Sequence, residues 1–426
     1  MTRCPTAYLE LDGYDPLPSR SGTGLLVAER LYVSDERRLT AVLLDGARRD
    51  WEVPRTKPPP ACYQVPRRIH STGLQLWADR HVVCQLLDGA DGVTVIAHRP
   101  SDGRELWRLE VPTPPALPWT EPRPAWDGAR TEELDAFLVA SEVLGVAIAR
   151  TTRRTMRWPD IPAPRFHAQL EVMRIEPASG SVAWRSSFPG LSIPVPERSR
   201  FLGAYLADGQ LGSIDWATGS VRYLAGLPGE PGWPRPRGRQ VLVPSRGRAA
   251  LAVDLFDGAS GHHLRRGEWR RPGVRETNLF VCDQHPILQL NQQFISLLSD
   301  EDLTPRWEAR ATPYVYAVAA VRSGPIFVAT SGNGGGLYAL DRLHGTVIAE
   351  ARLPGGAWGA TRVDGTRMIA SICGEGLAIA QDTQIHVAPL RGARAIAGSR
   401  DGHVVVLCGP PRPGVHVVDV RRVFGG

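Results

Sequence analysis

The stretch GGLYALDRLHGTVIAEARLPGG, which runs from Gly335 to Gly356, decides the fold. Apolar and polar residues alternate on both sides of a turn that spans Asp341 to Gly345. Such alternation is typical of a half-buried β-strand, and a glycine supplies the positive φ that a tight hairpin turn needs. The stretch therefore predicts a β-hairpin.

The same pattern recurs along the chain, with comparable hairpins beginning at residues 41, 93, 170, 211, 251 and 295. In three copies an aromatic residue follows the turn glycine by four positions, at Trp107, Trp184 and Tyr223. From Trp184 onward the second strands recur about every 40 residues, and a further strand pair precedes each hairpin. Four strands per unit at this period predict the blades of an all-β propeller.

Nine candidate hairpins can be counted, whereas propellers typically have four to eight blades. We favour eight four-stranded blades, with seven as the alternative. The segment TAYLELDG (Thr6–Gly13) is expected to complete the last blade, so that the N-terminal strand closes the ring and removes exposed sheet edges. The segment TEELDAFLVA (Thr131–Ala140) is expected to be a strand. We expect one domain over residues 1–426, with Pro-rich insertions at about 112–133 and 153–168.

The hairpins resemble the repeats of the pyrroloquinoline-quinone (PQQ) enzyme propellers. GGLYALDRLHGTV (Gly335–Val347) and SDGRELW (Ser101–Trp107) are similar to the family pattern Ala-x-Asp-x-x-x-Gly-x-x-x-Trp. The resemblance implies a propeller in which the tryptophan packs between neighbouring blades. The quinone enzymes also carry a vicinal cysteine pair, calcium-binding carboxylates, a catalytic aspartate and a secretion signal. The six cysteines of this chain are never adjacent, so we expect the fold without PQQ or another cofactor.

The N-terminal residues contain no apolar run of the kind that marks a signal peptide, and no stretch is long and apolar enough to span a membrane. The cysteines form no Cys-x-x-Cys pair. We therefore expect a cytoplasmic protein with reduced thiols that does not act at a membrane.

Positive charge is concentrated in one part of the chain. The formal net charge is +6, and ten arginines face only three carboxylates between residues 235 and 275. A local field of one sign attracts an acidic protein surface or, as an alternative, a nucleic-acid backbone. Solvated strands that bind nothing are the third interpretation. The candidate partner-binding residues of this basic sector are Arg235, Arg237, Arg239, Arg265, Arg266, Arg270 and Arg271.

The two Pro-rich insertions contain tryptophans that we expect to be exposed. Trp119 and Trp126 lie in the first insertion, and Trp158 lies in the second, close to Arg153 and Arg154. Proline fixes φ and stiffens a loop, and tryptophan with arginine is common at the centre of protein interfaces. These five residues are further candidates for partner contact, unless the loops fold back over their own blades.

Catalytic and metal signals are weak. His262, His263, Cys282 and His285 are a weak candidate zinc set, because only Cys282 and His285 have ligand-like spacing. No nucleophile elbow was found. We therefore expect a non-catalytic protein-binding subunit of a cytoplasmic complex. A propeller hydrolase or lyase with a site at the channel mouth, with or without a metal ion, is the first alternative, and a nucleic-acid-associated factor is the second.

Overall fold

The computed structural model describes residues 6–10, 24–34, 38–54, 67–70, 76–88, 92–112, 130–141, 145–156, 165–189, 203–205, 210–226, 230–231, 234–247, 249–258, 260–282, 284–311, 314–321, 323–332, 334–363, 368–373, 376–409 and 412–421. These residues form nine β-sheets, of which six have four strands, two have five and one has three. The only described helix is a single 3-10 turn, η1 (Asp45–Ala47). The all-β prediction is confirmed.

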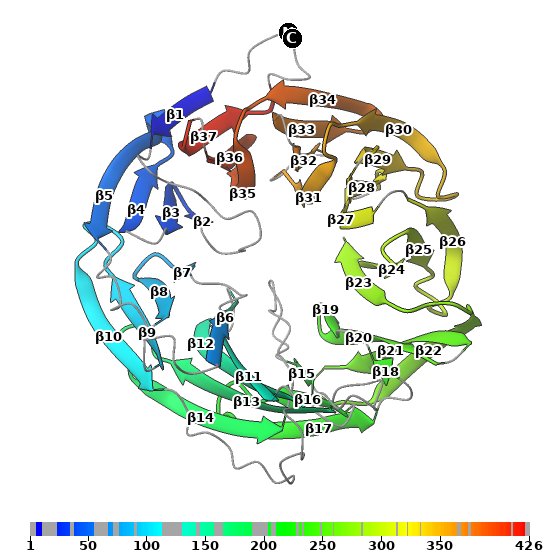
Figure 1. Ribbon diagram of the computed structural model, residues 1–426, viewed down its shortest axis with the longest axis horizontal. Helices are drawn as coiled ribbons and strands as arrows, with labels where there is room; N and C mark the ends of the chain where they lie inside the picture. Colours follow the sequence, from blue (N-terminus) through cyan, green and yellow to red (C-terminus); the bar gives the residue numbers. More distant parts are fainter. Residues whose placement is uncertain are drawn as a thin grey trace.

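The sheets follow one another in chain order around a common centre, with first strands such as β23 and β27 innermost and last strands such as β26 and β30 at the periphery (Figure 1). The first two sheets contain β2 (Gly24–Val27), β3 (Arg30–Ser34), β4 (Arg38–Leu43) and β5 (Arg48–Pro54), then β7 (Leu76–Ala78), β8 (Val83–Asp88), β9 (Gly92–His98) and β10 (Glu105–Pro112). The third contains β11 (Arg130–Ser141), β12 (Gly145–Met156), β13 (Arg165–Ile175) and β14 (Val182–Pro189), with β6 (Arg67–His70) parallel to β11. The strand predicted around Thr131–Ala140 is therefore confirmed as β11.

The smallest sheet contains β15 (Gly203–Tyr205), β16 (Gln210–Ile214) and β17 (Val221–Gly226). The next contains β18 (Glu230–Pro231), β19 (Arg235–Arg237), β20 (Gln240–Arg246), β21 (Ala250–Asp257) and β22 (His263–Arg270). Two regular sheets follow, with β23 (Thr277–Cys282), β24 (His285–Leu290), β25 (Phe294–Leu298) and β26 (Pro305–Arg310), then β27 (Tyr314–Ala320), β28 (Ile326–Ser331), β29 (Gly336–Leu340) and β30 (Val347–Arg352). The hairpin predicted from Gly335–Gly356 is β29–β30. The expected count of eight blades is not confirmed, because the described residues form nine sheets.

The last two sheets contain β31 (Ala357–Arg362), β32 (Met368–Cys373), β33 (Gly376–Gln381) and β34 (Gln384–Pro389), then β35 (Ala393–Arg400), β36 (His403–Cys408) and β37 (Gly414–Asp419). The outer strand of the final sheet comes from the other end of the chain. Strand β1 (Thr6–Glu10) pairs antiparallel with β37, with Tyr8 opposite His416. The N-terminal strand thus lies where the sequence predicted it.

Six of the hairpins between the third and fourth strand of a sheet share one turn geometry. In six of the described turns the N–H of the fifth residue donates to the carbonyl of the first, at 2.7–3.0 Å, as in Gly345 to Asp341. The fifth residue has a positive φ of 70° to 74° where it is glycine. In one turn the Asp215 carboxylate also accepts hydrogen bonds from Thr218 and Ala217, and these bonds hold the pKa of Asp215 below its usual range.

Tryptophans link neighbouring sheets through these turns. At four junctions the indole Nε1 donates to the carbonyl of the second turn residue of the next sheet, at 2.8–2.9 Å. The ring covers the turn glycine so closely that an added Cβ would lie 2.5–2.6 Å from the indole. The pairs are Trp51 with Gly103, Trp107 with Gly180, Trp184 with Gly219, and Trp307 with Gly345. The packing of tryptophan between neighbouring sheets, which the family resemblance implied, is therefore confirmed at these junctions.

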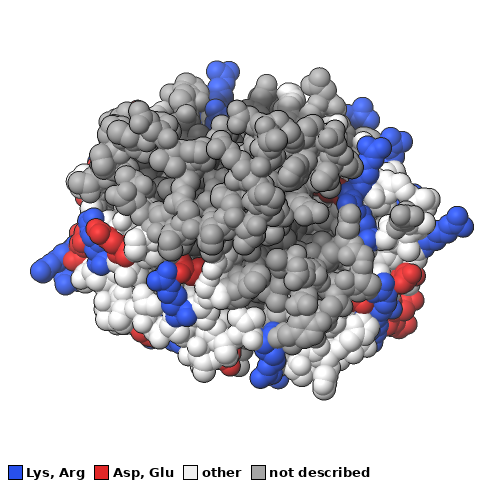
Figure 2. Space-filling view, turned by 60° about the horizontal axis from the view of Figure 1, so that its bottom comes forward, with Lys and Arg blue, Asp and Glu red and all other residues white. Residues whose placement is uncertain are grey.

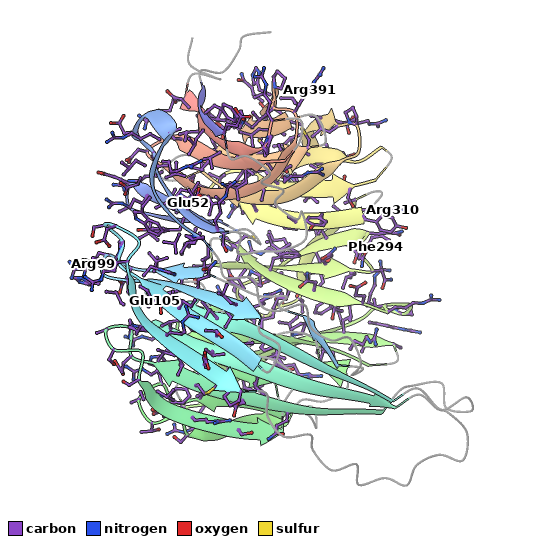
Figure 3. All side chains as sticks on the ribbon, turned by 60° about the vertical axis from the view of Figure 1, so that its left-hand side comes forward. Glu52, Arg99, Glu105, Phe294, Arg310 and Arg391 are labelled. Atoms are coloured by element: carbon purple, nitrogen blue, oxygen red, sulfur yellow. The ribbon has the colours of Figure 1, made fainter. Side chains whose placement is uncertain are left out.

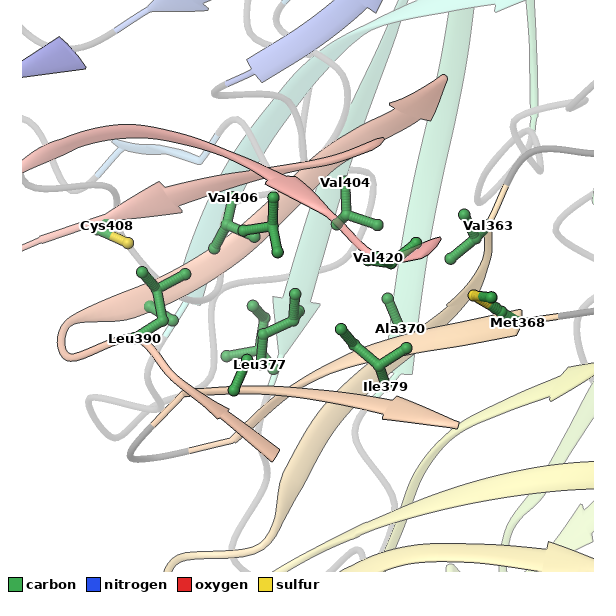
Figure 4. Packing of buried hydrophobic residues seen from close by; sticks show 14 residues of the cluster. Val363, Met368, Ala370, Leu377, Ile379, Leu390, Val404, Val406, Cys408 and Val420 are labelled. Atoms are coloured by element: carbon green, nitrogen blue, oxygen red, sulfur yellow. The ribbon is translucent and has the colours of Figure 1, made fainter. Parts of the chain in front are cut away.

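The hydrophobic core lies between sheets rather than in one centre. Inner strands such as β32 and β36 are buried along nearly their whole length. One cluster joins the sheet of β31–β34 to the sheet of β35–β37, with Ile379, Leu377 and Met368 on one side and Val404 and Val406 on the other (Figure 4). A comparable cluster joins Leu31 and Val42 of the first sheet to residues of β36 and β37 in the last.

The two ends of the sheets form two different faces of the molecule. One carries the repeated hairpin turns. The opposite one, here called the connector face, carries the turns between second and third strands and the connections from one sheet to the next. Phe294 and Arg310 lie on the connector side, away from Arg99 and Glu105 (Figure 3). The long strands β11, β12 and β13 also extend towards this side, and the segments 113–129 and 157–164 connect strands that end there. Among the residues described, no helix is long and apolar enough to cross a membrane.

Candidate functional site

The basic sector lies on β19 and β22, at the junction with the sheet of β23–β26. Arg235 reaches across this junction, with Nε donating to the Leu279 carbonyl at 2.8 Å and a second nitrogen donating to Asn278 Oδ1 at 3.2 Å. Arg237 forms an ion pair of 2.7 Å with Asp300. The inner arginines of the sector therefore fasten two sheets together.

One of the outer arginines, Arg266, pairs with a buried carboxylate. Asp254 is almost fully buried on β21, and both of its carboxylate oxygens accept hydrogen bonds from Arg266, at 2.9 and 3.2 Å. His263 Nε2 lies 2.9 Å from the same carboxylate. A buried carboxylate is costly unless it is paired and hydrogen-bonded, so Arg266 and His263 stabilise Asp254 in place.

Arg265 takes the position that tryptophan holds at other junctions. It pairs with Leu255 one step beyond a register shift, as Trp107 pairs with Ala97, and it donates to the backbone carbonyl of Asp300. Asp300 is the second residue of its turn, which is the residue whose carbonyl accepts the indole hydrogen bond elsewhere.

The turn that Arg265 contacts, between β25 and β26, also differs from the turns at the tryptophan junctions. Leu303 replaces the turn glycine and is fully buried at φ 60°. Its side chain packs in a cluster with Leu255, Val253 and Trp269 of the preceding sheet. A Cβ added to Gly267 would lie 2.5 Å from the Leu303 backbone, so this turn approaches its neighbour closely. Leucine thus fills a junction in which there is no indole ring.

The three remaining members of the sector are exposed or lie at its edge. Arg239 and Arg270 are exposed, and within the described part of the chain their side chains make no ion pair or hydrogen bond. Arg271 donates to Glu308 at 2.7 Å, and its guanidinium lies 4.9 Å from the centre of the Phe294 ring. Among the described residues on the face seen in Figure 2, basic side chains occur at several places, and some of them lie beside acidic side chains. Much of the local positive charge is therefore used inside the protein.

Of the weak metal candidates, the structure brings together only Cys282 and His285, which lie opposite each other in the pairing of β23 with β24. His263 contacts Asp254, and His285 Nδ1 lies 3.0 Å from Asp300 Oδ2. Cys282 donates to the Val318 carbonyl at 3.5 Å, and His262 is exposed. No group of three His, Cys, Asp or Glu side chains in the described ranges could hold a metal ion.

The candidates in the two insertions are placed only in part. Trp119, Trp126 and Trp158 lie outside the described residues. Arg153 and Arg154 lie on β12, opposite Glu133 and Glu132 of β11. Their role in partner contact remains a prediction.

A further group of residues on the connector face was missed by the sequence reasoning. The turn Asn291–Gln293 joins β24 to β25, and Phe294, which follows it, is paired directly with Arg310 of β26. The N–H of Val315 donates to the carbonyl of Gln292, which brings Tyr314 beside the turn. The alternation in the segment YVYAV was visible in the sequence, but the register that gathers these residues was not.

A family model described as "Outer membrane protein assembly factor BamB" matches residues 168–368. The C-terminal WD40 domain of Sif2 is similar with a TM-score of 0.50 and 10% identity, over 80% of this chain and 93% of that one. BamB from Moraxella catarrhalis is similar with a TM-score of 0.48 and 13% identity, over 90% of this chain and 98% of that one. The arrangement of the sheets, the family model and the likeness to the WD40 domain together identify the chain as a β-propeller with PQQ-like repeats.

One curated protein is also similar over a shorter length. The lipase LipV of Mycobacterium tuberculosis is 30% identical over 119 residues, which are 27% of this chain. The match covers 46% of the lipase, so the chain spans about half the length of this curated relative.

Proposed function

We propose that this propeller is a non-catalytic, protein-binding subunit of a cytoplasmic complex. In this proposal residues 1–426 form a single domain that acts as a rigid scaffold, and the pairing of β1 with β37 supports a ring that the N-terminal strand closes. One observation carries the proposal: both Pro-rich segments, with their three tryptophans, connect strands that end on one face of the molecule. Proline fixes φ and so lowers the cost of ordering a segment on binding, and tryptophan is one of the residues that contribute most to protein interfaces. The matched family model, which is named for an assembly factor, supports a role in protein contact.

The test is the mass of the protein as it exists in its own cells. Native mass spectrometry at low salt, compared with the denatured mass, should show a second polypeptide bound to the propeller. Trp126→Ala and Trp158→Ala should each reduce the amount of this polypeptide while the unfolding midpoint stays unchanged. A Trp233→Ala variant, which changes a tryptophan outside both insertions, is the matched control. A bare monomer from the wild type would contradict the proposal.

A second candidate function is that of a hydrolase, and two observations favour it. One is the local similarity to the lipase. The other is the pair of His285 and Asp300, because an aspartate on Nδ1 leaves Nε2 for a substrate or nucleophile, as in serine hydrolases. Within the described residues, no serine, threonine or cysteine side chain donates to His285. Hydrolysis of p-nitrophenyl butyrate by the wild type, lost in His285→Ala and kept in His263→Ala, would establish this function in place of the first.

A further inference from the structure

The turn Asn291–Gln293 is the hub of a rigid region on the connector face. Asn291 accepts hydrogen bonds from the backbone N–H groups of Arg275 and Glu276, at 2.7 and 3.2 Å, and donates to the Gly273 carbonyl at 3.0 Å. Gln292 donates to Glu276 at 2.9 Å. The connection that enters this sheet and the one that leaves it are both bonded to the same turn. A surface held in this way is ordered before it meets a ligand.

Three arginines lie around this turn and are not paired with the carboxylates near it. Arg275 lies in the connection between β22 and β23, and Arg310 is the last residue of β26, opposite Phe294. Arg270 ends β22, one residue before Arg271. All three are exposed, and none makes a side-chain ion pair or hydrogen bond within the described ranges. The nearby carboxylates are already used, since Glu308 pairs with Arg271 and Glu276 accepts from Gln292. The local charge is therefore positive.

Two tyrosines extend the surface towards the centre of the propeller. Tyr314 and Tyr316 lie on β27, an innermost strand, and are 51% and 54% exposed, whereas Val315 between them is buried. A register shift falls between Val315 and Ala317, so Tyr316 is the extra residue of a bulge, a device that re-aims a side chain. Large aromatic side chains left half exposed beside arginine are the residue types that dominate protein interfaces.

We propose that this surface binds an acidic segment of a partner protein that also carries aromatic or apolar residues. The surface, called the arginine rim, consists of Arg270, Arg275, Arg310, Tyr314 and Tyr316. Its carboxylates, Glu276 and Glu308, lie among the cations and would repel a continuous phosphate backbone. A peptide places its carboxylates at intervals and can present apolar residues to the tyrosines. The inference rests on the proposed function, since it names where that partner binds.

The test measures binding of a fluorescein-labelled peptide of alternating glutamate and phenylalanine by fluorescence anisotropy. The triple variant R270Q/R275Q/R310Q should bind about tenfold more weakly, since each rim charge contributes a fraction of a kcal/mol to about 1 kcal/mol. Tyr314→Ser should also weaken binding. Arg306→Gln is the matched control, because Arg306 is an exposed arginine on the same strand as Arg310 but at its opposite end. This control should bind like the wild type.

The inference is overturned if the wild type does not bind the peptide, or if the triple variant binds as tightly as the control. It is also overturned, in favour of a nucleic-acid surface, if oligo-dT binds in place of the peptide and the triple variant loses it. Failure of the proposed function is distinguishable. If a partner co-purifies equally well with the triple variant, the proposed function stands and only the arginine rim is refuted as the binding site.

Discussion

The junction between the sheets of β18–β22 and β23–β26 offers a direct test of how neighbouring sheets are held together. Elsewhere a tryptophan covers a turn glycine, whereas here Arg265 stands opposite Leu303. We expect that Arg265 and Leu303 can be replaced by tryptophan and glycine only when both residues are changed together. The perturbation is therefore a double-mutant cycle with R265W, L303G and the combination of both.

The magnitudes follow from the packing. At the tryptophan junctions an added Cβ would lie 2.5–2.6 Å from the indole, so a tryptophan at position 265 would collide with Leu303. Overpacking of this kind costs about 1–3 kcal/mol. Leu303→Gly empties the space of a fully buried leucine, which costs about 2–5 kcal/mol, less about 1 kcal/mol from relief of the positive φ. In the double variant the indole fills that space and covers glycine, so we expect a favourable coupling energy of about 2 kcal/mol.

The assay is equilibrium unfolding in guanidinium chloride, followed by circular dichroism and by tryptophan fluorescence to check that the transitions coincide. The reverse exchange, W307R with G345L, should show coupling of the same sign, because Gly345 lies under Trp307. A mixed pair, L303G with W51R, joins two different junctions and should be additive. Additivity of R265W and L303G within about 0.5 kcal/mol would refute the reasoning.

Three further predictions concern stability. Gly180→Ala should lower the free energy of unfolding by about 3 kcal/mol or more, because the new Cβ would lie 2.5 Å from the Trp107 ring. The control Gly46→Ala, with φ +68° and nothing within 4 Å of the new Cβ, should cost only the backbone strain of about 1–2 kcal/mol. Equal losses of stability in urea unfolding would contradict this prediction. Burial lowers the pKa of His416 from 6.5 to about 4, so the unfolded chain binds its proton first as the pH falls. The stability difference between wild type and His416→Phe should therefore be constant above pH 6.5 and should move against the wild type by about 3 kcal/mol between pH 6.5 and pH 4, and a difference independent of pH would contradict the assignment. Arg266→Met should cost about 3 kcal/mol by thermal unfolding, because it leaves the carboxylate of the buried Asp254 without its arginine. An unchanged midpoint would show that the pair contributes nothing.

Local chemistry allowed much of the fold to be predicted from the sequence. The spacing of glycine and tryptophan, as in Gly103 and Trp107, reports a turn and the strand position that follows it. Both lie within a few residues of one another, so period and turn type could be recognised without any long-range information. The pairing of β1 with β37 could be predicted because the last sheet needed an outer strand and an alternating segment remained. The sequence showed nine candidate hairpins, and the described residues form nine sheets; eight blades were favoured only because propellers typically have four to eight.

The candidate site could be predicted far less well. The sequence identified the basic sector as a cluster of charge, but it could not show that Arg237 pairs with Asp300, which is 63 residues away. Exposure of an arginine depends on which carboxylate or carbonyl the packing brings to it. The arginines expected to face a partner are therefore divided by tertiary structure into those that fasten sheets, such as Arg235, and those that stay exposed, such as Arg270.

The sequence by itself thus determined the unit of this protein: an antiparallel hairpin with a glycine turn, repeated around a propeller. It could do so because turn geometry and strand alternation depend on neighbouring residues. Only the tertiary structure decided which residues of different units meet. It brought Arg265 and Leu303 to one junction, in the places that tryptophan and glycine occupy at others. It also gathered Arg275, Arg310 and Tyr314 around one turn. Register and packing between sheets place these residues, and neither leaves a local pattern in the sequence.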